Sequence, residues 1–302
     1  MKKTGMACMA LVALMTAALG GTAMAKEAYN TGAAEIGMPV REMEISWESG
    51  SVTIATHAAE TVRIEEKSLF SLEERKQVHW KLENGELKIL SHEPGLTSLF
   101  GNKKKDLKVW LPETLVLDEL EIAVASASVN GVFPARELEI ASSSGAIHGT
   151  TEANEIEIAT ASGAIGLTHT GTAEKVALAT SSGKTECVLG TVRKFEASSA
   201  SGRFDLKVAE LTEKFKLETA SGQTDVAFGA VSGKVGIGSA SGKVTLTYPE
   251  GTGFTAKIKT ASGKVRCEFP CIVEGRTYTA GDGSVQTEID TASGSVTLAC
   301  AK

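Results

Sequence analysis

The sequence on either side of Ser221-Gly222 alternates apolar and polar residues. Before this dipeptide Phe215 and Leu217 occupy odd positions, and after it Val226 and Phe228 occupy even positions. Such alternation predicts two short strands, each with one buried face. The chain must lose one step of register near Ser221-Gly222, as it does at a corner or bulge, and glycine adopts the backbone angles of a corner at little cost. We call this corner the hinge.

Hinges of this type recur along the chain. They are Ser144-Gly145, Ser162-Gly163, Ser182-Gly183, Ser201-Gly202, Ser221-Gly222, Ser241-Gly242, Ser262-Gly263 and Ser293-Gly294. Successive hinges are 18, 20, 19, 20, 20, 21 and 31 residues apart, and Ser126-Ala127 holds the same place 18 residues before the first. The residue three before every hinge glycine is Ser or Thr, and the residue two before it is Ala or Ser.

A nearly constant period with strand-like patterning is typical of a solenoid, in which each repeat forms one coil and stacked coils share a core. A β-sandwich with chance Ser-Gly turns would require neither the equal spacing nor the fixed flanking residues. We therefore predict an all-β fold, a single-chain parallel β-solenoid (β-helix) with about 18–21 residues per coil. Each hinge should lie directly over the preceding one, about 4.8 Å away.

The orientation of the Thr-x-Ser pair at the hinge is open. If the register step falls at the glycine, both hydroxyls point inward. If it falls three or four residues earlier, Ala161, Ala200, Ala220 and Ala240 point inward and the pair lies outside, which the constant small size of that residue slightly favours. In the second case the pairs form a candidate hydroxyl column of Thr160, Ser162, Thr180, Ser182, Thr219, Ser221, Thr260 and Ser262.

The chain begins with a predicted signal peptide at residues 1–25. Lys2 and Lys3 precede an apolar run, and Ala23-Met24-Ala25 fits the small-residue cleavage rule. An uncleaved anchor is the alternative, but the run is short for a spanning helix. Cleavage would leave a protein without a transmembrane segment, exported to the periplasm, the cell surface or the medium.

After the signal peptide, the sequence divides into three segments. Residues 26–43 are an extended lead-in, residues 44–118 form N-terminal β coils or a β cap, and residues 119–302 hold the regular solenoid repeats. Asn84-Gly85, in the second segment, is either a corner of a coil or the turn of an antiparallel hairpin.

Two insertions interrupt the period. Residues 91–106 carry Leu96, Leu99 and Phe100 followed by Lys103–Lys105, an apolar tip beside a basic cluster. Such a tip could contact an anionic membrane or a partner protein. The alternative is a loop folded over the solenoid end with solvated lysines. Residues 271–283 enlarge the penultimate turn.

The net charge bears on the class of partner, and the cysteines bear on possible disulfides. Without Lys2 and Lys3 the 31 basic residues become 29, against 37 acidic residues, a net charge of −8 that argues against nucleic acid. Export permits disulfides. Of Cys187, Cys267, Cys271 and Cys300, we favour a disulfide between Cys271 and Cys300, although another pairing or none remains open.

The sequence predicts no catalytic, cofactor-binding or metal-binding residues. The five histidines (His57, His79, His92, His148, His169) lack metal-ligand spacing and are expected on the surface. The repeat instead stacks a candidate binding ridge just after the hinges. Stacked like charges are unfavourable, so this ridge is either a solvated face paired with nearby acids or a surface for an anionic glycan. Its residues are Lys184, Arg203, Gln223, Lys243 and Lys264.

The recurring Thr-Ala-Ser-Gly pattern, as in Thr160–Ile165 and Thr260–Val265, resembles the bacterial DUF4097 family of β-strand repeat proteins. So do Trp47–Ile54, and the Leu99-Phe100-Gly101 insertion before Leu107–Pro112. The resemblance covers about residues 40–300. It implies an exported parallel β-solenoid with an adhesive or scaffolding role and supplies no catalytic residues.

The function expected is therefore a non-enzymatic adhesin, or a cell-envelope binding or scaffold protein, whose ligand is an extracellular or cell-envelope glycan or protein. The first alternative is a carbohydrate-active parallel β-helix enzyme, which requires a groove with clustered carboxylates near the two insertions. The second is an ice-binding solenoid that uses the Thr-x-Ser columns.

Overall fold

The computed structural model describes residues 29–37, 39–95 and 104–301 of the chain. These residues form strands and one short 3₁₀ helix, η1 (Glu74–Lys76). They divide into two compact units, of which unit 1 runs to Ala153 and adds Glu157–Gly163, and unit 2 holds Asn154–Ile156 and Ala164 onward. The predicted signal peptide (residues 1–25) and the insertion tip with Leu96, Leu99, Phe100 and Lys103 lie outside the described residues.

Unit 1 contains strands β1 to β12. They are β1 (Asn30–Thr31), β2 (Ala34–Ile36), β3 (Glu42–Trp47), β4 (Gly50–His57), β5 (Val62–Ser68), β6 (His79–Glu83), β7 (Glu86–Leu90), β8 (Lys105–Pro112), β9 (Leu117–Val124), β10 (Ser128–Phe133), β11 (Ala135–Ser142) and β12 (Ile147–Thr151). The next strand, β13 (Glu155–Thr160), is divided between the units.

Unit 2 contains the strands that follow. They are β14 (Ile165–His169), β15 (Thr172–Thr180), β16 (Lys184–Ser199), β17 (Arg203–Ser221), β18 (Thr224–Val231), β19 (Lys234–Ser241), β20 (Val244–Pro249), β21 (Phe254–Thr260), β22 (Val265–Cys267), β23 (Cys271–Glu274), β24 (Thr277–Ala280), β25 (Val285–Thr291) and β26 (Val296–Ala301).

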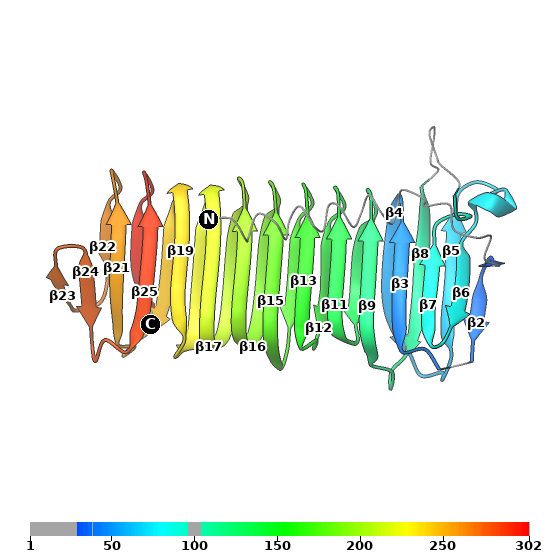
Figure 1. The fold of residues 1–302 in the computed structure, drawn as a ribbon, viewed down its shortest axis with the longest axis horizontal. Coiled ribbons are helices and arrows are strands. Elements are labelled where there is room, and N and C mark those ends of the chain that lie inside the picture. Colours follow the sequence, from blue (N-terminus) through cyan, green and yellow to red (C-terminus); the bar gives the residue numbers. More distant parts are fainter. Residues whose placement is uncertain (1–28, 38, 96–103, 302) are drawn as a thin grey trace. The chain divides into compact units, whose positions relative to one another are not determined.

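Parallel pairing between successive coils confirms the predicted solenoid. Lys184 pairs with Arg203, Phe204 with Thr224, and Thr224 with Val244, which are steps of one sequence repeat. Each coil therefore contributes one strand before its hinge and one after it. We call the resulting surfaces the pre-hinge sheet and the post-hinge sheet (Figure 1).

The two sheets of unit 2 enclose an aromatic core. Phe195 stacks on Phe215 at 4.6 Å between ring centroids, and Phe215 meets Phe228 of the other sheet edge-on at 5.4 Å. The series continues through Tyr248, Phe254 and Phe269. Each such aromatic pair adds roughly 0.5–1.5 kcal/mol beyond the area it buries, so neighbouring coils are coupled through the core as well as through backbone hydrogen bonds.

Glycine at the hinge is required chiefly by the approach of the neighbouring coil. A Cβ placed on Gly202 would overlap the carbonyl oxygen of Gly183, and one on Gly222 would overlap that of Gly202. Gly222 and Gly242 also have positive φ angles of 128° and 137°. The expectation that glycine supplies special backbone angles thus holds at these two hinges of unit 2. The more general reason for glycine at the stacked hinges is that the neighbouring coil leaves no space for a Cβ.

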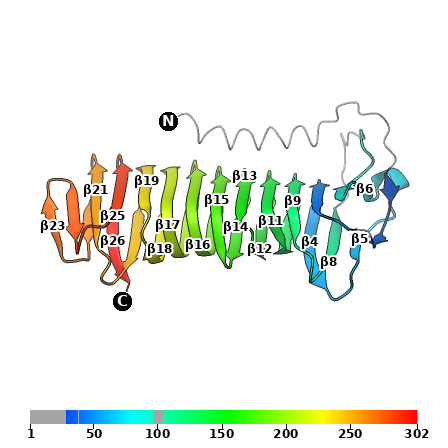
Figure 2. The same cartoon turned by 60° about the horizontal axis from the view of Figure 1, so that its bottom comes forward.

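The order of the coils departs from the sequence at the C-terminal end of unit 2. Val244 pairs with Val296, and Val265 pairs with the same Val296, so the last coil (β25 and β26) lies between the two coils that precede it. Figures 1 and 2 show β25 between β19 and β21. The expectation that each hinge lies over the preceding one is therefore wrong at Ser262-Gly263, which lies against Ser293-Gly294 instead of Ser241-Gly242, because the 31-residue spacing lets the chain return.

The N-terminal end of unit 1 contains the matching insertion. Strand β3 pairs with both β7 and β9, and β4 pairs with both β8 and β10, all in parallel. The first coil in the sequence thus lies between the second and the third. Each unit thus contains a coil that enters between two others.

Antiparallel strands cover the outermost coils. In unit 1, β1 and β2 pair with β6 and β5, so part of the predicted lead-in 26–43 is in fact ordered strand. Strands β6 and β7 form a hairpin with Asn84-Gly85 as its turn, where φ is 55° and 89°. The hairpin alternative for that dipeptide is therefore correct. In unit 2, β24 pairs antiparallel with β21 and with β23.

Lys105, expected in a basic surface cluster, is buried. Its Nζ atom lies 2.7 Å from the Glu66 carboxylate and donates to the Lys76 and Ser91 carbonyl oxygens. It also lies 4.7 Å from the centroid of the Trp47 ring. An ammonium with this many acceptors fixes the end of the insertion and is unavailable to a membrane, because removing it would leave Glu66, whose side chain is only 10% exposed, unpaired.

Replacing Gly202 by alanine tests the requirement for space at the hinge. We expect the Gly202→Ala substitution to lower the free energy of unfolding by about 1–3 kcal/mol, the usual cost of overpacking. Gly236→Ala is the matched control in unit 2, since a Cβ there would lie 3.7 Å from the nearest atom. Urea denaturation of both variants gives the comparison, and equal stability of Gly202→Ala and the wild type would contradict the steric explanation.

Candidate functional site

The predicted binding ridge forms a column on the post-hinge sheet of unit 2. Lys184 pairs directly with Arg203. Backbone hydrogen bonds from Phe204 to Gln223 and from Thr224 to Lys243 continue the series. Ser295 then lies between Lys243 and Lys264, because the last coil is inserted there. The ridge therefore places three cations and one amide in consecutive coils, with Lys264 two coils beyond Lys243.

An acidic column beside the ridge neutralises part of it. Glu186, Asp205 and Asp225 occupy consecutive register positions two residues after the ridge residues. Lys184 lies 2.5 Å from Glu186, and Arg203 lies 3.3 Å from Asp225. These pairs are exposed, where such interactions contribute little to stability.

The hydroxyl pairs do not form one surface, and both predicted orientations were wrong. Thr160, Thr180 and Thr219 are buried, while Ser162 and Ser182 are exposed, so the two hydroxyls of a pair face opposite sides. Thr260 and Ser221 are intermediate and Ser262 is exposed. The alanines that were expected inside are exposed (Ala200, Ala220, Ala240) or half-buried (Ala161).

The buried hydroxyl closes the hinge. Thr180 Oγ1 accepts a hydrogen bond of 2.9 Å from the backbone N–H of Gly183, and the same bond forms at other hinges, from Gly145, Gly163, Gly202, Gly263 and Gly294. At the two hinges with positive φ, Thr219 and Ser239 instead donate to the Ser221 and Ser241 carbonyl oxygens. The fixed Ser or Thr is thus a structural residue.

This assignment predicts opposite outcomes for the two hydroxyls of one hinge. Thr180→Val keeps the shape of the side chain but leaves the buried Gly183 N–H without an acceptor, which costs about 1–3 kcal/mol. Ser182→Ala should change the free energy of unfolding by no more than about 0.5 kcal/mol. Chemical denaturation measures both values, and a larger loss for Ser182→Ala than for Thr180→Val would refute the assignment.

Sequence reasoning missed an acidic surface on the pre-hinge sheet of unit 1. In two neighbouring columns, Glu42 pairs with Glu86 and Glu119, and Glu44 pairs with Lys88 and Glu121. Strand β11 extends both columns. The signal in the sequence is a Glu-x-Glu motif at the same place before successive hinges. We call this surface the glutamate grid, formed by Glu86, Glu42, Glu119, Glu137, Lys88, Glu44, Glu121 and Glu139.

Crowding of carboxylates perturbs the grid. Partial burial and the charges of Glu44, Glu139 and Glu119 raise the pKa of Glu121 to about 7. Burial and the neighbouring glutamates also raise the pKa of Glu119. Lys88 pairs with Glu44 and Glu86 at one edge of the grid, at 2.9 Å in each case. The remaining repulsion makes the ionised grid an unfavourable surface by itself.

The raised pKa of Glu121 predicts that acidification stabilises the grid. Between the ordinary pKa of 4.5 and about 7, the folded chain binds more protons than the unfolded chain, so stability falls as pH rises through this window. Glu121→Gln should raise Tm above pH 7 by about 1–3 °C and have little effect below pH 4.5. Calorimetry at both pH values tests this, with exposed Glu113→Gln as control. A Glu121→Gln effect equal at both pH values, or matched by the control, would exclude the mechanism.

A second missed column consists of lysines on the pre-hinge sheet of unit 2. Lys175 pairs with Lys194, Lys194 with Lys214, and Lys214 with Lys234. All four side chains point away from the core, and we call them the lysine ladder. Lys194 contacts Glu213 at 3.4 Å and Lys214 contacts Glu196 at 3.3 Å, both on the surface.

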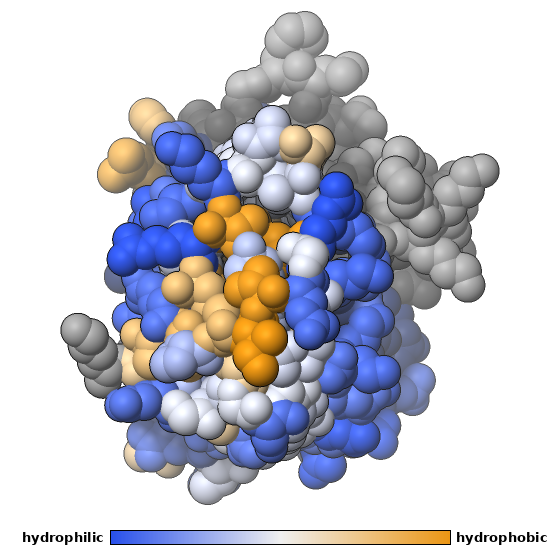
Figure 3. All heavy atoms as spheres, turned by 90° about the vertical axis from the view of Figure 1, so that its left-hand side faces the viewer, coloured by the Kyte–Doolittle hydropathy of each residue, from blue (hydrophilic) through white to orange (hydrophobic). Residues whose placement is uncertain are grey.

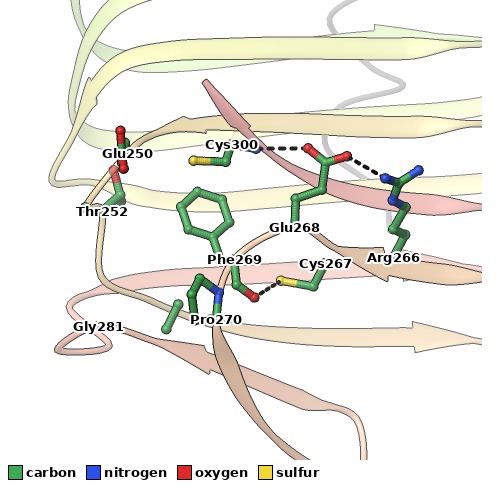
Figure 4. Close-up of a pocket in the computed structure, with 11 residues that line it drawn as sticks. Glu250, Thr252, Arg266, Cys267, Glu268, Phe269, Pro270, Gly281 and Cys300 are labelled. Atoms are coloured by element: carbon green, nitrogen blue, oxygen red, sulfur yellow. Dashed lines mark hydrogen bonds and ion pairs between the residues drawn. The ribbon is translucent and has the colours of Figure 1, made fainter. Parts of the chain in front are cut away.

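A cavity of about 850 Å³ lies at the C-terminal end of unit 2, beside the second insertion (Figure 4). It contains two carboxylates, Glu250 and Glu268. Glu268 is held by Arg266 at 3.2 Å and by the Cys300 N–H at 3.4 Å. Figure 4 shows Phe269 and Cys300 between the two carboxylates, which do not point at each other. Catalysis by paired carboxylates requires two that face a common substrate position.

The cysteines do not adopt the favoured pairing. All four in the described chain are free thiols, and Cys267 contacts Cys271 rather than Cys300. Burial raises the pKa of the Cys267 thiol to about 11, which keeps it protonated and unreactive at neutral pH. Cys267 Sγ donates to the Phe269 carbonyl oxygen at 3.8 Å, so the chain reversal at Phe269-Pro270 brings the thiols of residues 267 and 271 together.

The end of unit 2 also exposes apolar side chains. Ile272 and Val273 of the edge strand β23 are 69% and 52% exposed, and Figure 3 shows apolar atoms gathered on this face. No group of three or more His, Cys, Asp or Glu side chains in the described residues could hold a metal ion. Nor does any helix within them have the length and apolar character needed to cross a membrane.

Two histidines differ from the surface positions expected for them. His79 and His169 are 6% and 2% exposed. His92 pairs with the Glu48 carboxylate at 2.8 Å, and this hydrogen bond raises its pKa.

A comparison with models of protein families agrees with the repeat pattern of the chain. The family model for Toastrack DUF4097 matches residues 40–232. The comparison with curated proteins found no match.

Among solved structures, a candidate cell adhesion protein from Clostridium sporogenes is 13% identical, covering 91% of this chain and 100% of that one, with a TM-score of 0.25. A candidate lipid-binding protein from Parabacteroides distasonis is 15% identical over 89% and 96%, with a TM-score of 0.43. A candidate adhesin from Bacteroides fragilis is 9% identical over 89% and 97%, with a TM-score of 0.35. Likeness at this level adds no argument to the family match.

Proposed function

The chain belongs to the Toastrack DUF4097 family, and from this premise we propose that it is an exported, non-enzymatic binding or scaffold protein of the cell envelope, an adhesin in the broad sense. The observation that carries the proposal is the column arrangement of its surface. Parallel register repeats one class of side chain about every 4.8 Å, so a polymeric ligand meets the same contact several times.

The ligand class that fits the post-hinge sheet of unit 2 is an anionic glycan. Lys184, Arg203 and Lys243 stand in one column of that sheet, with Gln223 between Arg203 and Lys243, and Lys243 and Lys264 make no ion pair with other described residues. Single contacts of exposed lysines are weak. Several contacts on one polymer act together, because each bound unit raises the effective concentration of the next.

Export is proposed from the sequence of residues 1–25, whose basic start, apolar run and Ala23-Met24-Ala25 end are those of a signal peptide. It places the protein in the periplasm or at the cell surface, where polyanionic glycans are available.

Charge reversal tests the ridge. The variant Lys184→Glu/Arg203→Glu/Lys243→Glu/Lys264→Glu should bind immobilised polygalacturonate at least about tenfold more weakly than the wild type at low salt. The matched control reverses the four residues of the lysine ladder, which changes the net charge equally on the other sheet. Surface plasmon resonance gives the dissociation constants.

Two results would overturn the proposal. If the ridge variant binds as tightly as the wild type while the control loses binding, another surface holds the glycan. If the wild-type chain shortens polygalacturonate during incubation, the carbohydrate-active enzyme alternative is correct instead.

A further inference from the structure

The glutamate grid is a charged face without enough cations of its own. It holds seven glutamates and one lysine on the outer side of the pre-hinge sheet of unit 1. Glu42, Glu119 and Glu137 are exposed, and no cation of the described part of the chain forms an ion pair with them. Like charges at directly paired positions are destabilising. A cationic partner would relieve that cost.

The lysine ladder of unit 2 has the complementary charge. Lys194, Lys214 and Lys234 are exposed. The side chains of Lys194 and Lys214 are each 52% accessible despite their contacts with Glu213 and Glu196. Exposed ion pairs of this kind are worth little, so these lysines can exchange one carboxylate for another.

The glutamate columns of the grid and the lysine ladder also have the same geometry. Each arises from parallel strands on a pre-hinge sheet, and each spans four successive coils. Their repeat distance is therefore the same, about 4.8 Å. A column of glutamates laid along a column of lysines can place an opposite charge at every step. A random charged surface would satisfy one or two contacts and misalign the others.

We propose that the glutamate grid of one molecule docks on the lysine ladder of a second copy of this chain. The second copy is the occupant favoured by the charges and by the matched period of the two columns. This inference goes beyond glycan binding and uses the other sheet of unit 2. Self-association of this kind would join copies side by side through their flat pre-hinge faces.

Two matched variants test the docking. The grid-reversed chain carries Glu42→Lys/Glu119→Lys/Glu137→Lys, and the ladder-reversed chain carries Lys194→Glu/Lys214→Glu/Lys234→Glu, all at exposed positions. We expect the wild type to self-associate at about 50 mM salt and to dissociate at about 0.5 M, where screening shortens the range of charge interactions. Each variant alone should associate at least about tenfold more weakly.

An equimolar mixture of the two variants should restore association, because the reversed grid of one then faces the reversed ladder of the other. Sedimentation velocity measures all four samples, and circular dichroism with a thermal melt confirms that each variant is folded. The four-residue ridge variant should self-associate like the wild type. A ridge variant that loses glycan binding but still self-associates separates this inference from the proposed function.

Three outcomes would overturn the inference. The wild type remains monomeric at low salt; either reversed chain associates as strongly as the wild type; or the mixture stays dissociated although both variants are folded. If the monomeric wild type binds polylysine and the grid-reversed chain does not, the grid serves a foreign cationic partner, and docking between copies is wrong.

Discussion

The structure depends on how closely two coils approach each other at the hinge. The glycine column leaves no room for a Cβ, so the backbone of one coil lies directly against the carbonyl oxygen of the next. A buried Ser or Thr three residues earlier accepts the glycine N–H at most hinges and fixes the corner. Because every hinge is closed in one of two similar ways, neighbouring strands keep a common register, and side chains of successive coils fall into columns.

Register explains the surface chemistry as well as the core. Inside unit 2 it brings the rings of Phe195 and Phe215 into a stack and carries the series on to Phe269. Outside, the same rule stacks like charges, whose repulsion is reduced where a neighbouring column supplies the counter-charge. The ridge has such a column in Glu186, Asp205 and Asp225. In the described chain the glutamate grid contains one lysine, Lys88, at its edge, and its exposed Glu42, Glu119 and Glu137 form no ion pair. That difference separates a paired surface from one that favours a cationic partner.

The period, the parallel pairing and the ridge in consecutive coils could be predicted because each depends on residues at one fixed offset from the hinge. The direction of the Thr-x-Ser pair could not, because both predicted cases assumed that its two hydroxyls face the same side. The grid was visible as a recurring Glu-x-Glu motif, yet its meaning requires the order of coils in space. That order could not be read from the sequence, since a 31-residue spacing fits an enlarged loop as well as a coil inserted elsewhere. The favoured disulfide failed locally, because the reversal at Phe269-Pro270 turns Cys271 toward Cys267.

The inserted end coils follow from a weakness of solenoids. A coil at the end of a stack has a neighbour on one side only. Placing the terminal coil between two others gives it partners on both sides, and in unit 2 the buried hydrogen bond between Tyr248 and Thr287 ties the inserted coil to its neighbour. In each unit, antiparallel strands cover the outermost coil. The edge strand β23 of unit 2 is only four residues long and ends in Glu274. Short edges resist uncontrolled strand addition, which favours the sheet faces, with their columns of charge, as the binding surfaces.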